Sequence, residues 1–157
     1  HLNRLKEYIL FMYKQGVYIP ANVSKYRGDH RNIFYRSSWE QKFMKYCDTH
    51  PHILEWGSEE IWIPYKNPLT RRVSKYYPDF YIKVRDKDGR LKKYIIEIKP
   101  IKQTKPPIKS KKSNKQYLYE ANTYAKNQAK WDAARKYCRK RQAEFLVFTE
   151  KELGLRF

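Results

Sequence analysis

The 157-residue sequence is poor in cysteine and in acidic residues, and it has no long apolar run. Its two cysteines, Cys47 and Cys138, stand in no CxxC or CxxH pairing, so their spacing does not indicate a zinc site. Both fall at apolar positions of predicted helices, where we expect buried thiols in a reducing compartment. No stretch approaches the roughly 20 apolar residues of a membrane span. No basic helix has a clean apolar face either, which argues against a membrane-binding protein.

The scarcity of acidic residues leaves a strongly basic protein. There are 35 Lys and Arg residues against 16 Asp and Glu, a formal net charge of +19. A charge of this size opposes compaction and implies an anionic partner, of which nucleic acid is the commonest. Apolar residues make up 41% of the sequence, enough for a folded core, and the length suits a single domain. We recognise no secretion signal, and the sequence starts at His1 rather than Met.

The first third of the sequence predicts two helices separated by an irregular segment. Apolar residues at helical spacing predict a helix over residues 2–14, and residues 16–35 are interpreted as an extended arm packed along the body. A second helix is predicted from Ser37 to about His50, where Pro51 follows. Its inward side chains are expected to be those of Trp39, Phe43, Tyr46 and Cys47.

The middle of the sequence predicts strands. Residues 53–65 are interpreted as a hairpin that turns near Gly57-Ser58. Residues 73–84 and 91–99 predict two further strands, and the Asp-Lys-Asp-Gly sequence at 86–89 between them is typical of a hairpin turn.

The last third predicts one long helix and one strand. The helix extends over about 116–141, with a break near Asn127, and residues 144–149 form a short apolar strand. Together these elements predict an α/β fold, a single domain in which helices flank a small mixed sheet. The sequence does not specify an oligomeric state.

Two carboxylates and a lysine meet in the predicted central hairpin. Glu97 and Lys99 lie two residues apart in one strand, so alternation places both on one face, while Ile96 and Ile98 point to the other. If the turn centres on Asp88, Asp79 lies directly opposite Glu97. The same register sets Lys83 against Lys93, a slightly unfavourable contact near the turn.

Directly opposed carboxylates repel each other, and a divalent cation removes the repulsion. Mg²⁺ prefers oxygen ligands, usually one or two carboxylates with water and substrate phosphate. Asp79, Glu97 and a backbone carbonyl such as that of Ile98 suit it. Such a metal activates a bound water and stabilises charge on a phosphate, and Lys99 would hold that water or neutralise charge in the transition state.

Two plainer explanations compete with this interpretation. Asp79, Glu97 and Lys99 could be ordinary surface charges of a hairpin, because Asp and Lys are common on surfaces. Glu40 fits a capping box, in which its carboxylate accepts a hydrogen bond from the backbone of Ser37.

The order Glu40, Pro78-Asp79, Glu97-Ile98-Lys99 resembles the PD-(D/E)xK nuclease superfamily, and within it the head-completion nucleases of phages with contractile tails. The resemblance covers roughly residues 17–153. It also rests on the segments Asn22-Val23-Ser24-Lys25-Tyr26-Arg27-Gly28-Asp29, Tyr35-Arg36-Ser37-Ser38-Trp39-Glu40, Trp56-Gly57-Ser58-Glu59, Ile63-Pro64-Tyr65, Asn127-Gln128-Ala129-Lys130-Trp131 and Phe148-Thr149-Glu150.

The resemblance implies an αβββαβ restriction-endonuclease-like core and Mg²⁺-dependent cleavage of DNA, with Mn²⁺ as a plausible substitute. It assigns catalysis to Glu40, Asp79, Glu97 and Lys99, and metal binding to Asp79, Glu97, Ile98 and Glu40. It further implies action as an endonuclease or exonuclease on packaged DNA before head–tail joining. Head, portal or neck proteins would be partners, in the virion or in the host cytoplasm during assembly. We divide the sequence into an N-terminal helix and arm, 1–35, and a nuclease core, 36–157.

Other functions remain open at this point. Another PD-(D/E)xK endonuclease, acting in transposition or junction resolution, would carry the same motif. A structural DNA-binding protein of head closure with little activity would carry the same charge. One local departure from the resemblance is Arg141-Gln142, which stands where a glycine is expected at the helix end.

Contacts with DNA are predicted from a basic loop and one helix face. Between Lys99 and Lys115 there is no acidic residue, and such charge favours binding that does not depend on base sequence. Asn127 and Lys130 match a secondary motif of transposon-encoded endonucleases and lie one helical turn apart, although a solvated helix face is an equal alternative. The predicted DNA-binding residues are Lys102, Lys105, Lys109, Lys111, Lys112, Lys115, Asn127 and Lys130.

Overall fold

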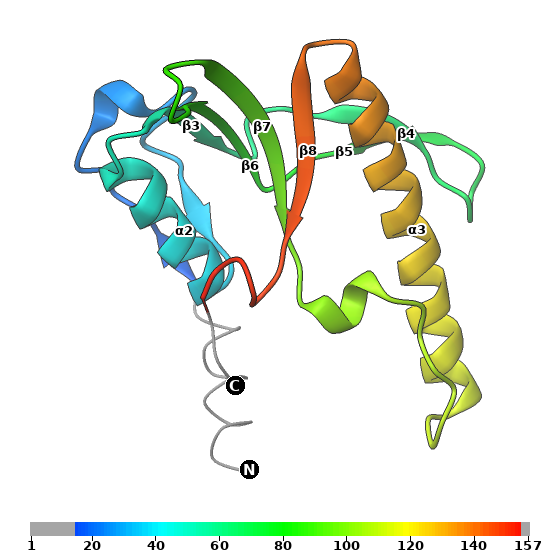
Figure 1. The fold of residues 1–157 in the computed structure, drawn as a ribbon. Coiled ribbons are helices and arrows are strands. Elements are labelled where there is room, and N and C mark those ends of the chain that lie inside the picture. The colour runs from blue at the N-terminus through cyan, green and yellow to red at the C-terminus, as the bar shows by residue number, and fades with distance from the viewer. Residues whose placement is uncertain (1–14, 155–157) are drawn as a thin grey trace.

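In the computed structural model, which describes residues 15–154, a central four-stranded sheet lies between two helices (Figure 1). The strand order is β3-β6-β7-β8, with β8 parallel to β7 and the other neighbours antiparallel. The chain order of these elements gives the predicted αβββαβ core. Its elements are α2 (Ser38–Thr49), β3 (Ile53–Ser58), β6 (Phe80–Arg85), β7 (Leu91–Ile98), α3 (Asn114–Arg139) and β8 (Ala143–Phe148). The helix predicted over 2–14 lies outside the described residues.

The hairpin of β6 and β7 has the predicted register. Phe80 lies opposite Ile96 and Ile82 opposite Tyr94. The turn at 86–89 is held by the Asp86 carboxylate and by Gly89, whose φ of 78° lies in the left-handed region that glycine adopts without strain. The register therefore brings Asp79, just before β6, beside the end of β7.

The strand predictions between Ile53 and Val84 were wrong in two respects. The single strand predicted over 73–84 is divided between β6 and an earlier strand, Val73–Tyr76, that belongs to another sheet. β3 does not turn at Gly57 but runs on to Ser58 and pairs with β6, over twenty residues later in the chain. The next two strands, β4 (Ile63–Lys66) and β5 (Val73–Tyr76), form a separate hairpin. The interpretation failed because a run of apolar residues reports burial but does not identify its partner strand. This β4–β5 hairpin packs against α3 and is an insertion between β3 and β6 of the core.

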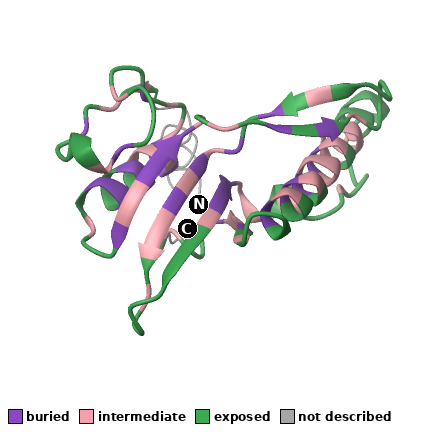
Figure 2. Cartoon of the chain, turned by 90° about the horizontal axis from the view of Figure 1, so that it is seen from above, coloured by how far each residue is buried: buried purple, intermediate pink, exposed green. Residues whose placement is uncertain are grey.

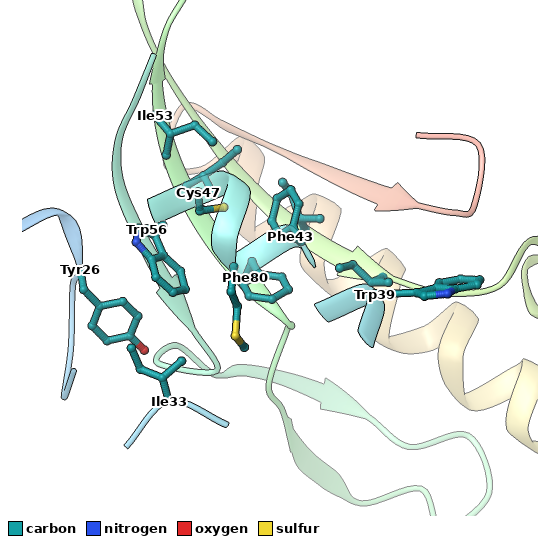
Figure 3. Close-up of a cluster of buried hydrophobic side chains, with 12 residues drawn as sticks. Tyr26, Ile33, Trp39, Phe43, Cys47, Ile53, Trp56 and Phe80 are labelled. Carbon is teal, nitrogen blue, oxygen red and sulfur yellow. The ribbon is translucent and has the colours of Figure 1, made fainter. Parts of the chain in front are cut away.

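Alternation along β7 divides the interior into two apolar clusters. Ile96 and Ile98 join the cluster under α2, where Phe43 contacts Phe80 and Phe148 edge to face. Figure 3 shows Phe43 beside Phe80 in this cluster. Ile95 points to the other face and packs with α3 and the β4–β5 hairpin. The predicted inward residues Trp39, Phe43 and Cys47 of α2 are buried, but Tyr46 is half exposed. Figure 2 shows burial concentrated in the central strands.

Residues 15–35 pack along the core, as the prediction of an arm requires. They contain β1 (Gly16–Val17), β2 (Phe34–Tyr35) and a short 3₁₀ helix, η1 (Val23–Lys25). The buried Asp48 of α2 accepts hydrogen bonds from the Tyr18 hydroxyl and from the backbone N–H groups of residues 21 and 22, at 2.7–2.9 Å. Lys25 donates to the carbonyls at the end of α2. The domain boundary at residue 35 stays a prediction.

Helix α3 is continuous, so the predicted break near Asn127 was wrong. It ends at Arg139, with Lys140 as the C-cap, and Gln142 then adopts a φ of 53°. That left-handed conformation is the reason a glycine was expected there. Cys47 and Cys138 are both buried and unbonded, as predicted. No helix within residues 15–154 is long and apolar enough to cross a membrane.

Candidate active site

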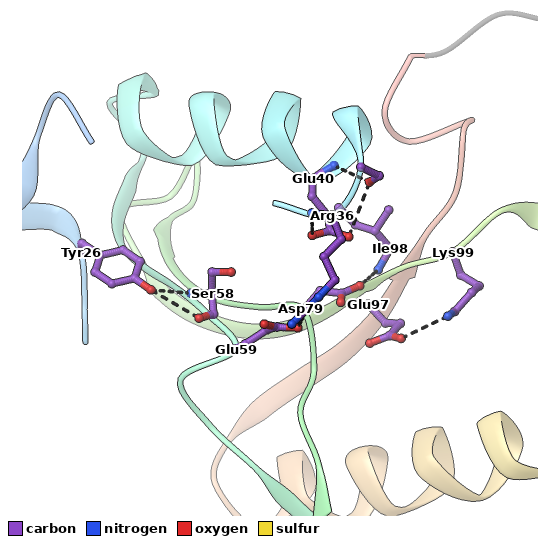
Figure 4. Close-up of polar contacts among 10 residues, drawn as sticks. Tyr26, Arg36, Glu40, Ser58, Glu59, Asp79, Glu97, Ile98 and Lys99 are labelled. Atoms are coloured by element: carbon purple, nitrogen blue, oxygen red, sulfur yellow. Dashed lines mark hydrogen bonds and ion pairs between the residues drawn. The ribbon is translucent and has the colours of Figure 1, made fainter. Parts of the chain in front are cut away.

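Asp79 lies in the short connection between β5 and β6, at the open end of the central hairpin. Its Oδ2 accepts a hydrogen bond of 2.7 Å from the backbone N–H of Ile98, at the end of β7. Its backbone carbonyl accepts from the N–H of Glu59, just after β3. Asp79 is therefore fixed between the ends of three segments of the sheet (Figure 4).

Glu97 is buried on the face of β7 that is covered by α3. Its Oε2 accepts a hydrogen bond of 2.6 Å from the hydroxyl of Tyr76, the last residue of β5. Its Oε1 lies 3.7 Å from the Nζ of Lys99 (Figure 4). Lys99 is held in turn by its backbone N–H, which donates to the carbonyl of Phe148 in β8. The predicted placement of Glu97 and Lys99 on one face is confirmed.

The carboxylates of Asp79 and Glu97 repel each other, and water reaches them poorly. Burial, then the nearby charge of Glu97 and that of Glu40, raises the pKa of Asp79 well above its usual value. Burial also raises the pKa of Glu97, although Lys99 and the Tyr76 hydroxyl oppose the rise. Such a pair differs from solvated surface charges, so the plainer interpretation of a surface hairpin does not describe this site.

Glu40 stands at the start of α2 and takes part in its cap. Its backbone N–H donates to the Oγ of Ser37, as in a capping box. Its carboxylate accepts from the backbone N–H of Arg36, at 3.0 Å, rather than from the predicted N–H of Ser37. Burial is the main reason that the pKa of Glu40 is raised. The charge of Glu40 also acts on Asp79, so this residue belongs both to the cap and to the electrostatics of the site.

The carboxylates of the site suit a divalent cation that needs few protein ligands. Among residues 15–154, no three side chains of His, Cys, Asp or Glu gather closely enough to hold a metal ion by themselves. Mg²⁺ needs fewer protein ligands, because it keeps several waters and binds through one or two carboxylates. Asp79 and Glu97 fit that requirement. Burial and then the charge of Glu97 raise the pKa of Asp79, and a cation between the two carboxylates would offset both effects.

Helix α3 adds Lys130 near Glu97 and Asn127 one turn earlier, and neither lies on a solvated face. Lys130 is half buried, with its Nζ 5.6 Å and 5.7 Å from the ring centres of Tyr76 and Tyr65. Burial lowers its pKa, and the nearby charge of Glu97 opposes that shift. Asn127, one turn earlier, is only 7% exposed. The alternative of a solvated helix face is therefore excluded for both.

The basic segment after Lys99 is partly ordered. It begins with a 3₁₀ helix, η2 (Ile101–Thr104), and Ile101 donates its N–H to Glu150. Lys112 forms an ion pair with Glu120 of α3, and the Nζ of Lys109 donates to the carbonyl of Lys112. The other predicted DNA-binding lysines of this segment are exposed. They are Lys102, Lys105, Lys111 and Lys115.

The sequence interpretation missed three residues around the site. Tyr76 hydrogen-bonds Glu97, although nothing near it in the sequence signals that contact. Arg36 forms an ion pair with Glu59 at the rim, and Glu59 has a φ of 53°. Arg36 lies just before the helix cap, which is the one signal that could have placed it next to Glu40.

Comparison with known proteins agrees with this geometry. A family model described as TnsA-like endonuclease N terminal matches residues 50–150. The head completion nuclease of Enterobacteria phage T4 is 39% identical over 142 residues, which cover 88% of this chain and 92% of that protein. The chain therefore belongs to the TnsA-like, PD-(D/E)xK-type endonucleases and is a DNA nuclease related to the head completion nuclease.

Proposed function

We propose that this protein hydrolyses phosphodiester bonds of DNA with the help of Mg²⁺ held by Asp79 and Glu97. The observation that carries the proposal is the carboxylate pair itself: burial, and then the charge of Glu97, raises the pKa of Asp79, and Lys99 lies 3.7 Å from Glu97. Two carboxylates that share a poorly solvated site cost folding free energy, even with one lysine beside them. A bound metal ion would neutralise the two carboxylates and so remove this cost.

Each residue has a defined role in this proposal. The carboxylates of Asp79 and Glu97 bind the metal, and the backbone carbonyl of Ile98 completes the protein ligands. A bound Mg²⁺ supplies a water of lowered pKa and stabilises charge on the phosphate. Lys99 holds the attacking water or neutralises the charge that develops on the phosphate. Glu40 acts on the site through its negative charge and a water molecule rather than as a direct ligand, because its carboxylate is engaged with Arg36.

The relative from phage T4 suggests the biological setting. A head completion nuclease that is 39% identical to this chain supports a role in finishing the packaged head before the tail joins. The protein would then act in the host cell during assembly or within the virion, next to head, portal or neck proteins. The net charge of +19 suits binding to DNA with little choice of base sequence.

The test is incubation of linear and closed circular duplex DNA with Mg²⁺, Mn²⁺, Ca²⁺ or a chelator. We expect cleavage with Mg²⁺ and Mn²⁺ and none with the chelator. Cutting of the circle would indicate endonuclease activity, and loss of the linear form alone would indicate exonuclease activity. If neither DNA is cut with any metal, the proposal fails and a structural DNA-binding role takes its place.

A further inference from the structure

A cleft of about 510 Å³ opens next to the proposed active site, between α3 and the segment that leaves β7. One end is lined by Lys102, three residues after Lys99, and by Asn127, one helical turn from Lys130. The volume is in the range of sites that bind small organic groups. The cleft thus begins three residues from Lys99 and one helical turn from Lys130, and neither carboxylate of the proposed site lines it.

The amide of Asn127 faces this cleft without a partner. The residue is 93% buried, yet its side chain makes no hydrogen bond with any residue from 15 to 154. The amide atoms are not among the fully enclosed polar atoms without a partner in residues 15–154, so they are open to the cleft. An Asn side chain offers two donors and an acceptor in one plane, which suits a ligand with a polar edge of alternating donors and acceptors.

The remaining walls supply flat apolar surfaces and positive charge. Tyr119 and Tyr124 of α3 line the cleft together with Pro107 and Ile108 of the preceding segment. Tyr119 is 71% exposed, which leaves its ring free to stack. The ion pair of Lys112 with Glu120 fastens the outer segment to α3, so the cleft is already formed without a ligand.

We propose that this cleft binds one unpaired base of the DNA strand that enters the active site. Aromatic rings stack on any base, and an Asn amide pairs with the edge of a base. Lysines at the rim neutralise the adjoining phosphates. A base within a duplex has both faces covered and its pairing edge occupied, so only an unpaired nucleotide fits without being extruded. The inference rests on the proposal that DNA is the substrate and specifies which form of DNA the site prefers.

The first test uses the unaltered protein and fluorescence anisotropy in chelator, which prevents cleavage. The probes are a blunt duplex and the same duplex with a short thymidine extension on its 5′ or its 3′ end. We expect about tenfold tighter binding for one of the two extensions, the gain typical of stacking one base. Replacing the thymidines one by one with abasic nucleotides should remove the gain at a single position. Equal affinity for all three probes would overturn the proposal.

The second test compares two asparagines of the same helix. Asn127→Ala should reduce the ratio of extended-probe to blunt-probe affinity to about one. Asn122→Ala is the matched control, because Asn122 lies on α3 outside the cleft lining. Lys115→Ala should weaken both probes by the same factor, as expected for a phosphate contact. An unchanged ratio in Asn127→Ala, or the same loss in Asn122→Ala, would refute the assignment.

The two proposals fail in different ways. If the base preference is present but no metal supports cleavage, the nuclease proposal is wrong and the cleft assignment stands. If cleavage of blunt duplex proceeds normally and no extension binds more tightly, the cleft assignment is wrong and the nuclease proposal stands.

Discussion

On the face of the central sheet under α2, strand β7 contributes Ile96 and Ile98 to a packed apolar cluster. On the face under α3, the same strand presents Glu97 and Lys99, with Tyr76 and Lys130 around them. On the first face, the side chains of β7 that join the cluster are apolar. The second has a carboxylate, a hydroxyl and two amines at the same level of the sheet.

The contrast shows how one strand serves two purposes. The residues that face α2 contribute burial of apolar area, which is the main source of folding free energy. That stability allows the other face to keep Asp79 and Glu97 together, although their repulsion and burial oppose folding. Changes under α2 should therefore affect folding, and changes under α3 should affect chemistry.

The largest expected effect is on catalysis. Asp79→Ala and Glu97→Ala should each lower cleavage at least about a thousandfold, equivalent to roughly 4 kcal/mol of transition-state stabilisation. Binding of DNA should be kept or become tighter, because negative charge is removed. Single-turnover cleavage and gel shifts would measure the two properties, with Asp88→Ala, an exposed aspartate of the same hairpin, as control. Cleavage at the parental rate by either variant would contradict the site assignment.

The second effect should be confined to folding. Phe43→Ala removes a ring that packs against Phe80 and Phe148, and should cost about 3–5 kcal/mol. In a domain of this size that corresponds to a melting temperature lower by roughly 6–20 °C. Leu118→Ala, exposed on α3, is the control and should change stability by under about 0.5 kcal/mol. If Phe43→Ala melts like the parent, the α2 face is not the stabilising one.

Glu40 tests the boundary between the two faces. Glu40→Gln keeps an acceptor for the N–H of Arg36 but removes the charge that acts on Asp79. We expect at least a tenfold fall in cleavage rate, about 1.4 kcal/mol, with a melting temperature within a few degrees of the parent. Thermal unfolding and cleavage on one preparation would decide it. A parental cleavage rate would leave Glu40 as a cap alone.

The smallest effect concerns the basic segment outside both faces. Replacing Lys105, Lys111 and Lys115 by Ala leaves the ion pair of Lys112 with Glu120 intact. Binding should weaken alike for all sequences, and the slope of log affinity against log salt should flatten by up to about 2.7, at about 0.9 per contact. Gel shifts over a salt series would measure the slope. An unchanged slope would mean that these lysines do not touch the DNA backbone.

Much of the site could be predicted because it depends on residues that lie close together in the sequence, within one hairpin. The Asp-Gly turn fixes the register of β6 and β7, and alternation then places Asp79 beside Glu97 and Lys99. Contacts between distant segments were not predictable. The pairing of β3 with β6 and the hydrogen bond of Tyr76 to Glu97 depend on the inserted β4–β5 hairpin, whose course no local pattern specifies. The same holds for Asp48, whose partners lie in the arm.

The central claim is that Asp79 and Glu97 are held together for a divalent cation, and melting temperature against pH tests it most directly. Both carboxyls have a folded-state pKa above the unfolded value. The native protein therefore binds more protons than the unfolded chain. The contribution of the two carboxyl groups to stability falls as pH rises from their unfolded to their folded pKa values.

In chelator, the melting temperature of Asp79→Asn should exceed that of the parent increasingly from pH 5 to pH 8. Mg²⁺ should then raise the parent's melting temperature and leave the variant's unchanged. A pH-independent difference, together with equal Mg²⁺ shifts in both proteins, would contradict the account.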